Sequence, residues 1–426
     1  MKLLLIILLT FLISAPPFSV VSNTNPYPAK IFIHSVEEDS YMSILDDDLS
    51  YYWIINNDNK GVDFKVNNSK LTFYHKPNDI LNNPFWIVAD HTMTEVDSIQ
   101  CTRGFTDFHD MIITDNNTYI LQSYDSKVMD LSSIGASEFQ LVNDILRIQE
   151  FDLDHNLIFD WDASEHLNIY DYASTLFSQN LIDGFIWMHG NSIEIDHDNN
   201  LILSNRTSSE IIKINRLSGE LIWILGGPLN EFQILDDPLN GTYSQHDVTR
   251  LENGNLLIFD NRTFAPNLHR NNISRVVEYE LDEVNKTARL VWEFKNPYDY
   301  TSFSMGSAQR LPNQNTFINW GNCNQPNIAA NIMEVDYNKN IVLELQFSNH
   351  QSYKATKSEF EFSIPMNVGD INLDNTLNIQ DIIAIINYVL SSNESYSIFY
   401  LYKADVNRDH LINIIDIIEV VNRALN

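Results

Sequence analysis

Basic residues are scarce in this sequence. It holds 26 lysines and arginines against 57 aspartates and glutamates, which gives a formal net charge of −31 over 426 residues. Nucleic acids and anionic membrane surfaces both favour a basic protein surface, so neither is expected as a partner. The charge balance does not exclude a small anionic ligand, because such a ligand responds to the local field inside a cleft.

Long apolar runs are also missing beyond the N-terminus. The run from Leu3 to Ile13 follows Lys2 and precedes Ala15 and small residues up to Ser22, which is the pattern of a secretory signal. The run is shorter than the roughly twenty apolar residues that cross a bilayer, and no later segment approaches that length. We therefore predict a signal peptide at 1–22, no transmembrane segment, and a secreted protein with an extracellular, cell-surface or periplasmic location.

Cysteine is nearly absent, since the chain contains only Cys101 and Cys323. With 44% apolar residues the chain can build a sizeable core without them. An exported protein could pair the two thiols, but their separation in the sequence gives no geometric support for a bond. A disulfide between them stays an open alternative.

Helical periodicity is rare in the body of the chain, where short strands rich in Ile, Val, Leu, Tyr and Phe alternate with Asn, Asp and Gly turns. One unit has strands at Leu201–Ser204, Ile211–Asn215 and Leu221–Leu225, and a weaker unit is expected at 59–96. Further strands are expected at Leu256–Phe259, Val276–Glu280, Leu290–Phe294, Thr316–Trp320, Ile332–Asp336 and Ile341–Phe347. Such units at a long period predict an all-β fold, a β-propeller for which we expect six blades.

Three histidines fall at the same phase of the repeating unit. His109, His189 and His246 each precede an expected innermost strand, and Gly306 lies in that place in the next unit. The innermost strands of a propeller surround its axis, so residues at one phase of successive blades should meet at one mouth of the central channel. Histidines that only bond the backbone would give the same pattern.

Converging imidazoles suit either transition-metal binding or nucleophilic attack and proton transfer on a charged group. Asn191 and Arg206 lie beside the histidines in this alignment. A planar guanidinium fits a tetrahedral oxyanion better than it fits beside a metal cation. The residues therefore favour an oxyanion substrate, with a propeller metalloenzyme and purely structural histidines as the alternatives.

The stretch from about His109 to Phe347 resembles the bacterial arylsulfate sulfotransferase family of secreted or periplasmic propeller enzymes. The resemblance rests on the order and spacing of several short motifs. These are His109-Asp110, His189-Gly190-Asn191-Ser192-Ile193, Leu203-Ser204-Asn205-Arg206, 218–227, Gln245-His246-Asp247, 259–261, 274–279 and 306–313. It implies transfer of a sulfuryl group from an aryl sulfate donor to a phenolic acceptor through a sulfohistidine, without a nucleotide sulfate donor.

By this resemblance His246 is the nucleophile that is transiently sulfated. The residues that hold the sulfate oxygens are His189, Asn191 and Arg206, and His109 completes the pocket. Splitting the transfer into two displacements lets one site serve donor and acceptor in turn. The leaving phenoxide needs a proton, which His109 or His189 could give. Candidate walls for an aromatic substrate, each with a plain core role as its alternative, are Trp187, Phe264, Phe303 and Trp320.

The C-terminal segment carries two copies of one pattern, 35 residues apart. Positions 1, 3, 5, 7, 9 and 12 of a twelve-residue loop hold oxygen ligands for Ca²⁺ in this pattern. The first copy has Asp370, Asn372, Asp374, Thr376, Asn378 and Asp381, and the second has Asp405, Asn407, Asp409, Leu411, Asn413 and Asp416. Leu411 is acceptable because position 7 binds through its backbone carbonyl. Each loop runs into an apolar helical segment, so the pattern predicts half an EF-hand, twice.

This duplicated loop and helix, over about 368–426, resembles the type I dockerin module, whose family docks onto cohesin domains. Asn375 and His410 replace the usual glycine at position 6. Ile379-Gln380 and Ile414-Ile415 lie at positions 10 and 11, which determine partner specificity in the family. The resemblance implies bound calcium and a cohesin-like partner, and a purely structural calcium site is the alternative.

Together these patterns predict a signal peptide at 1–22, a propeller at 23–365 and a dockerin-like domain at 366–426. The predicted function is a secreted aryl-sulfate sulfotransferase, tethered to an extracellular partner through the calcium-dependent domain. The rival hypothesis is a non-catalytic propeller that binds a glycan or a protein and is displayed through the same domain.

Overall fold

The computed structural model describes residues 16–36, 40–56, 61–77, 82–177, 184–263, 273–323, 325, 327–362, 368–372, 376–390, 403–407, 409 and 411–425. Two compact units divide the chain. The large unit covers 18–52 and 56–364, and the small unit contains 365–426. Among the described residues, no helix is both long and apolar enough to span a membrane.

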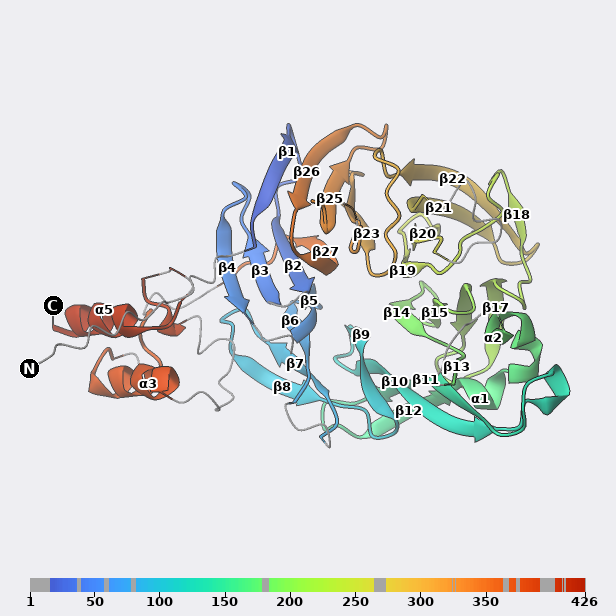
Figure 1. Cartoon of the computed structure of the whole chain (residues 1–426), viewed down its shortest axis with the longest axis horizontal. Coiled ribbons are helices and arrows are strands. Elements are labelled where there is room, and N and C mark those ends of the chain that lie inside the picture. The colour runs from blue at the N-terminus through green and yellow to red at the C-terminus, as the bar shows by residue number, and fades with distance from the viewer. Residues whose placement is uncertain are drawn as a thin grey trace, which may run out of the picture. The chain divides into compact units, whose positions relative to one another are not determined.

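Six sheets make up the large unit and are arranged around one central axis, as Figure 1 shows. From the innermost strand outward, blade 1 consists of β27 (Gln351–Ser358), β2 (Lys30–Val36), β3 (Tyr41–Leu45) and β4 (Tyr51–Asn56), and blade 2 of β5 (Gly61–Asn67), β6 (Lys70–His75), β7 (Phe85–Ala89) and β8 (Glu95–Ile99). Blade 3 consists of β9 (Phe105–Ile113), β10 (Tyr119–Met129), β11 (Gln140–Phe151) and β12 (Leu157–Asp162), with β13 (Phe185–Ile186) parallel to β11.

Blades 4 to 6 continue in the same order: β14 (Gly190–Ile195), β15 (Leu201–Asn205), β16 (Glu210–Ile214) and β17 (Leu221–Gly226); β19 (His246–Arg250), β20 (Leu256–Asp260), β21 (Arg275–Asp282), β22 (Thr287–Lys295) and β18 (Gln233–Leu235); β23 (Ser307–Arg310), β24 (Thr316–Asn319), β25 (Ala330–Val335), β26 (Ile341–Phe347) and β1 (Phe18–Asn23). Short helical turns follow blade 3: α1 (Ala163–His166), η2 (Ile169–Tyr172) and α2 (Ala173–Phe177), and η1 (Ser132–Ile134) precedes β11.

The prediction of an all-β propeller with six blades is confirmed. The unit expected at 59–96 is blade 2, and the strands expected between Leu201 and Phe347 coincide with β15–β17, β20–β22 and β24–β26 to within a few residues. Two details differ, because His109 lies inside β9 and His246 is the first residue of β19, whereas both were expected before an innermost strand.

Residues from the two ends of the propeller sequence close the ring. β27 is the innermost strand of blade 1, whereas β1 is the outermost strand of blade 6 and pairs with β26 from Phe18↔Phe347 to Asn23↔Leu343. Residues 18–22 are therefore used by the fold, although the sequence placed them in the signal peptide. The signal peptide and its bounds stay a prediction.

Side chains on the innermost strands of blades 3 to 6 connect each of these four blades to the next one in the ring. In each connection, a side-chain oxygen just after the histidine position of one innermost strand accepts a hydrogen bond from a backbone N–H of the next innermost strand. The pairs are Asp110 with Ile193, Ser192 with Val248, Asp247 with Ala308 and Ser307 with Ala355, at 2.9, 3.1, 3.0 and 3.4 Å. A regular spacing of the blades follows from this ladder, and it brings residues of one phase close together.

Large aromatic side chains fill the spaces between the blades. Trp187 is 1% exposed and Trp320 is fully buried, and both pack in apolar clusters between neighbouring sheets. Burial of a large apolar side chain contributes about 1.5–3 kcal/mol. These two tryptophans are therefore core residues and not substrate walls, and Phe264 lies outside the described residues.

Both cysteines are free and buried, in two separate apolar clusters. Burial raises the pKa of Cys101 and of Cys323 to about 12. A thiol needs its thiolate form to react, so these side chains are inert core residues.

The small unit contains α3 (Ile379–Leu390) and α5 (Ile414–Leu425), each beginning at position 10 of one of the predicted calcium loops. Ile371 and Val406 from the loops, with Ile385 and Val420 from the helices, form its buried core. Within each helix, apolar residues of this core lie three positions apart, which fits the spacing of an amphipathic helix. The duplicated sequence thus folds as a duplicated loop and helix.

Candidate active site

A β-bulge interrupts each of the three strands that carry the histidine phase. The register shifts between Thr106 and Met111 in β9, between Gly190 and Ser192 in β14, and between His246 and Val248 in β19. A bulge bends its strand and redirects the side chains around it. In β19 the extra residue is Asp247, whose φ of 61° allows adjacent side chains to leave the usual alternation.

The histidines meet in one cavity of about 510 Å³. The distance between the ring centroids is 4.6 Å for His109 and His189 and 6.0 Å for His109 and His246. The lining residues are Asp107, Phe108, His109, Tyr124, Asp144, His189, Arg206, His246, Phe303, Ser304, Met305 and Tyr353. Four of the five predicted catalytic residues are therefore brought together.

A hydrogen bond at Nδ1 orients each imidazole. Nδ1 of His109 lies 2.7 Å from Oδ1 of Asp107, and Nδ1 of His189 lies 2.7 Å from Oδ2 of Asp144. Nδ1 of His246 lies 3.0 Å from the carbonyl oxygen of Gly306. A carbonyl can only accept, so Nδ1 of His246 carries the proton and Nε2 of the neutral ring keeps its lone pair. That lone pair is what a nucleophile requires.

Burial keeps the His246 ring neutral. It lowers the pKa of His246 well below the ordinary value, and the positive potential of His109, Lys354 and Arg206 lowers it further. Burial also lowers the pKa of His189. The cavity thus favours the form of His246 that can attack an electrophile.

This pKa shift predicts an unusual pH dependence. Protonation of His246 consumes its lone pair, so a lowered pKa keeps the nucleophile available to more acid pH. We expect the acid limb of kcat/KM for an aryl sulfate to lie below pH 6.5, the ordinary histidine value. Initial rates measured over a range of pH give the position of this limb. Lys354→Met removes a nearby positive charge and should move the limb to higher pH, whereas a wild-type limb above pH 6.5 would contradict the assignment of this group.

Arg206 lies on the turn after β15 and is tied to the cavity on two sides. Its backbone N–H donates to the carbonyl of His189 at 2.8 Å, and its guanidinium donates to the carbonyl of Phe303 at 3.2 Å. The Phe303 ring is 51% exposed although its carbonyl is also held by Thr263 at 2.7 Å. A firmly held backbone that presents an exposed ring is suited to contact an apolar ligand.

Asn191 is placed differently from the other predicted residues. Its side chain is fully buried and donates through Nδ2 to the carbonyl of Gln245 at 2.7 Å. It does not belong to the residues that line the cavity. Its side chain thus contacts the chain just before His246.

Sequence reasoning missed Asp144, Tyr124 and Tyr353. The hydroxyl of Tyr353 donates to the carbonyl of His109 at 2.9 Å, and its ring contacts the His246 ring edge-on at 5.6 Å. Tyr124 stacks on His189 and donates to the carbonyl of Gly190. None of the three belongs to a histidine motif, so only the fold could reveal them.

Asp247 follows His246 directly, but the partners of its carboxylate in the described part of the chain are not histidines. Its carboxylate accepts the N–H of Ala308 at 3.0 Å and pairs with Nζ of Lys354 at 3.2 Å. Lys354 also lies 3.7 Å from Asp110, and Asp110 is paired with Lys65. These groups form an ion-pair network along the innermost strands, beside the cavity.

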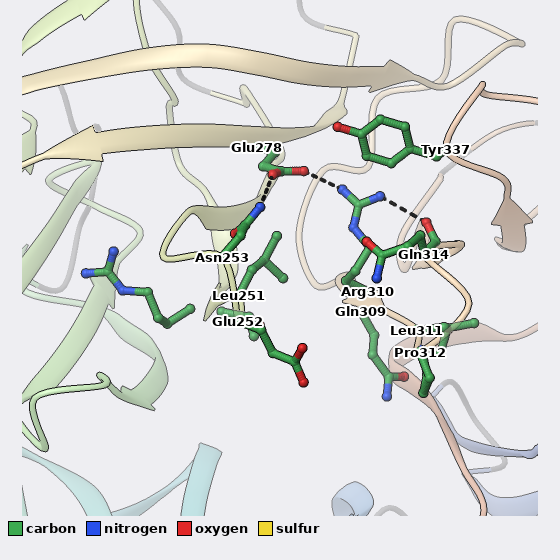
Figure 2. A pocket seen from close by; sticks show the side chains of 12 residues that line it. Leu251, Glu252, Asn253, Glu278, Gln309, Arg310, Leu311, Pro312, Gln314 and Tyr337 are labelled. Atoms are coloured by element: carbon green, nitrogen blue, oxygen red, sulfur yellow. Dashed lines mark hydrogen bonds and ion pairs between the residues drawn. The ribbon is translucent and has the colours of Figure 1, made fainter.

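A larger cavity of about 850 Å³ is lined by residues 249–253 and 309–312, at and beyond the C-terminal ends of β19 and β23. Figure 2 shows its side chains. Its wall contains the pair of Arg310 and Glu278 at 2.6 Å, with the Arg310 guanidinium 4.8 Å from the ring centroid of Trp292 and 5.2 Å from that of Tyr337. It contains none of the predicted catalytic residues. Size alone therefore does not identify the reactive cavity, and chemistry does.

The two C-terminal loops have the same hydrogen bonds. Oδ1 of Asp381 accepts the N–H of Ile371 at 2.8 Å, and Oδ1 of Asp416 accepts the N–H of Val406 at 2.7 Å. Oδ2 of each aspartate accepts the N–H at loop position 9, at 2.9 and 2.8 Å. Asp370, Asn372, Thr376, Asn378, Asp405, Asn407, Asp409, Leu411 and Asn413 lie in the described loops, and Asp374 lies outside the described residues.

The donor set fits calcium, because hard oxygen ligands from Asp, Asn and backbone carbonyls are what this ion prefers. Within the described ranges, no three His, Cys, Asp or Glu side chains gather closely enough to share a metal ion. The carboxylates and amides of each loop would have to hold the ion together. Position 12 is already fixed in both copies, since Asp381 and Asp416 are fully buried.

A six-bladed propeller with one cavity lined by three imidazoles and one guanidinium is a class of propeller suited to an oxyanion. The family model described as arylsulfotransferase (ASST) matches residues 15–356. The chain belongs to this family, and residues 368–426 match the type I dockerin domain.

The chain is also similar to individual known proteins. The arylsulfate sulfotransferase AssT of Escherichia coli O6:H1 is 29% identical over a region that covers 40% of this chain and 35% of the relative. The chain thus spans about a third of that relative's length. A protein of unknown function from Bacteroides caccae (12% identity, 78% of this chain, 99% of that chain) has a TM-score of 0.48, and virginiamycin B lyase from Staphylococcus aureus (12%, 77% and 88%) has 0.38.

Proposed function

We propose that this protein is a secreted aryl-sulfate sulfotransferase that uses His246 as its nucleophile. One observation carries the proposal: a neutral His246, fixed by the carbonyl of Gly306, lines one cavity with two further imidazoles and Arg206. Family membership and the match to AssT support the reaction class. The donor is an aryl sulfate and the acceptor a phenol, and no nucleotide sulfate donor takes part.

The first displacement forms a sulfohistidine. The Nε2 lone pair of His246 attacks sulfur, an N–S bond forms, and the bond between sulfur and the aryl oxygen breaks. Its electron pair leaves on the phenolate oxygen, which takes a proton from His109 or His189. In the second displacement an acceptor phenol returns a proton to that imidazole while its oxygen attacks sulfur, and the N–S bond breaks.

Arg206 and His189 supply the electrostatic part of the rate. Sulfuryl transfer spreads negative charge over three equatorial oxygens, as phosphoryl transfer does, and positioned donors stabilise that charge. Phe108, Phe303 and Tyr353 give the same cavity aromatic walls. The cavity thus combines an anion-binding part with a part that accepts a ring.

Intact-protein mass spectrometry tests the proposal. The full chain is mixed briefly with 4-nitrophenyl sulfate, with and without phenol, and nitrophenolate release is followed in parallel. We expect one added sulfuryl mass on the peptide that contains His246, and loss of that mass when phenol is added. Release without an adduct would contradict the covalent step, and neither release nor adduct across several aryl sulfates would favour the rival binding propeller.

We also propose that the C-terminal unit binds calcium and docks onto a cohesin-like protein at the cell surface or in an extracellular assembly. Each loop keeps its position-12 aspartate in the same hydrogen bonds. Ile379, Ile414 and Ile415 at the predicted specificity positions are 63%, 62% and 48% exposed. The partner surface that meets them should therefore be apolar.

Removal of calcium should loosen the small unit and leave turnover intact. Without the ion, the loop carboxylates repel one another and the helices lose their anchor. We expect EDTA to increase amide hydrogen exchange of α3 and α5 severalfold, without a change in the propeller strands. Asp381→Ala with Asp416→Ala should reproduce the effect without EDTA. Loss of turnover in EDTA would instead support the propeller metalloenzyme.

A further inference from the structure

Gln245 connects the nucleophile to the arginine turn. It directly precedes His246, and its side chain is fully buried. Its Nε2 donates to the carbonyl of Asn205 at 3.2 Å and to the carbonyl of Glu210 at 3.0 Å, with Oγ of Ser204 at 3.3 Å. The two carbonyls lie at either end of the turn that carries Arg206.

The backbone of Gln245 is held as firmly as its side chain. Its carbonyl accepts Nδ2 of Asn191 at 2.7 Å, and the next residue, His246, is fixed through Nδ1 to Gly306. The N–H of Ser244 donates to Oγ of Ser209 on the same turn at 3.0 Å. The partners of Nε2 include two carbonyls, which can only accept, so this site needs an amide donor and a carboxylate cannot replace it.

We infer that Gln245 is a positioning residue that sets the separation between the His246 imidazole and the Arg206 guanidinium, with Asn191 holding the peptide between them. Neither side chain needs to touch the substrate for this role, in agreement with their burial. The inference gives Asn191 a different task from binding sulfate oxygens. Its kinetic consequence rests on the proposed function, and its electrostatic consequence does not.

The electrostatic consequence concerns the titration of His246. Four charged or titratable groups act on this imidazole, and Tyr353 packs against it. The four are His109, His189, Arg206 and Lys354. Because the guanidinium of Arg206 disfavours the imidazolium, a turn released from Gln245 should let the pKa of His246 rise.

NMR titration of the His246 imidazole in the full-length protein tests this in four variants. Gln245→Met and Arg206→Met should both raise the midpoint, and the double variant should raise it no further than Arg206→Met alone. Gln309→Met is the matched control, since Gln309 also bridges two strands through the backbone of Lys357, at 2.9 and 2.8 Å, at the cavity of Figure 2. Its midpoint should equal that of the wild type.

Turnover of 4-nitrophenyl sulfate gives the second readout. Displacement of Arg206 by a fraction of an ångström to 1 Å should lower kcat in Gln245→Met by about 10–100-fold, with no further loss when Arg206→Met is added. The inference would be overturned if the kcat losses of Gln245→Met and Arg206→Met multiplied in the double variant. An unchanged His246 titration midpoint in Gln245→Met would overturn it as well. Gln245→Asn, which keeps the amide but cannot span the turn, serves if Gln245→Met does not fold. A wild type without turnover would refute the proposed function, and the titration would still decide this inference.

Discussion

Replacement of His246 by asparagine should abolish both the sulfuryl adduct and the release of phenolate. Asparagine keeps a polar side chain of similar reach but has no lone pair basic enough to attack sulfur. Deletion of a nucleophile in covalent enzymes costs several orders of magnitude, so we expect kcat to fall by about 10⁴-fold or more. Stopped-flow release of nitrophenolate and intact mass measure the two effects on one sample.

His34→Asn is the control for this change. His34 is a fully buried propeller histidine in β2, and Oγ of Ser40 lies 3.2 Å from its Nε2. It does not line the histidine cavity, so this variant should lose stability and keep its kcat. Turnover that survives His246→Asn would refute the role of His246 as the nucleophile. If the wild type binds a glycan or a protein and His246→Asn binds it equally well, the protein is a binding propeller.

Replacement of Arg206 by methionine should lower kcat far more than it changes KM. The guanidinium donates to oxygens whose charge grows in the transition state, so its contribution is largest there. Loss of one such donor costs about 10²–10³-fold in kcat. Arg206→Lys should recover part of the loss, because a lysine restores the charge without the planar pair of donors.

Arg262→Met provides the matched control for an arginine in the same propeller. Arg262 is buried and donates to the carbonyl of Gly241 at 3.0 Å and to Asp260 at 3.1 Å. Asp260 keeps a second partner, Arg275 at 2.9 Å, so its carboxylate stays paired in this variant. A raised KM with unchanged kcat in Arg206→Met would mean that Arg206 binds ground state and transition state equally.

The repeat made much of the fold and part of the site predictable. Strands between Asn, Asp and Gly turns recur at a long period, and the histidines keep one phase within it. Propeller geometry then requires His189 and His246 to converge, and their rings do lie in one cavity. The expected number of six blades agrees with the six sheets, although the period alone did not determine it.

Bulges and distant partners were beyond the reach of the sequence. The bulge at Asp247 depends on a positive φ at a residue other than glycine, which no local pattern announces. Asp144 lies 45 residues before His189, which it orients, and Tyr353 lies 244 residues after His109, to which it donates. Asn191 could be placed beside the histidines by spacing, but the direction of its side chain depends on the bulge in β14.

The cavity is completed late in synthesis of the chain, because β27 closes the ring of blades. Tyr353 and Lys354 reach the histidines only when Gln351–Ser358 pairs with β2, a strand made more than three hundred residues earlier. A nascent chain therefore has His246 and Arg206 long before it has a finished cavity. The proposed chemistry requires the whole propeller, so an incomplete copy left by a stalled ribosome or a protease carries His246 without Tyr353 and Lys354 beside it.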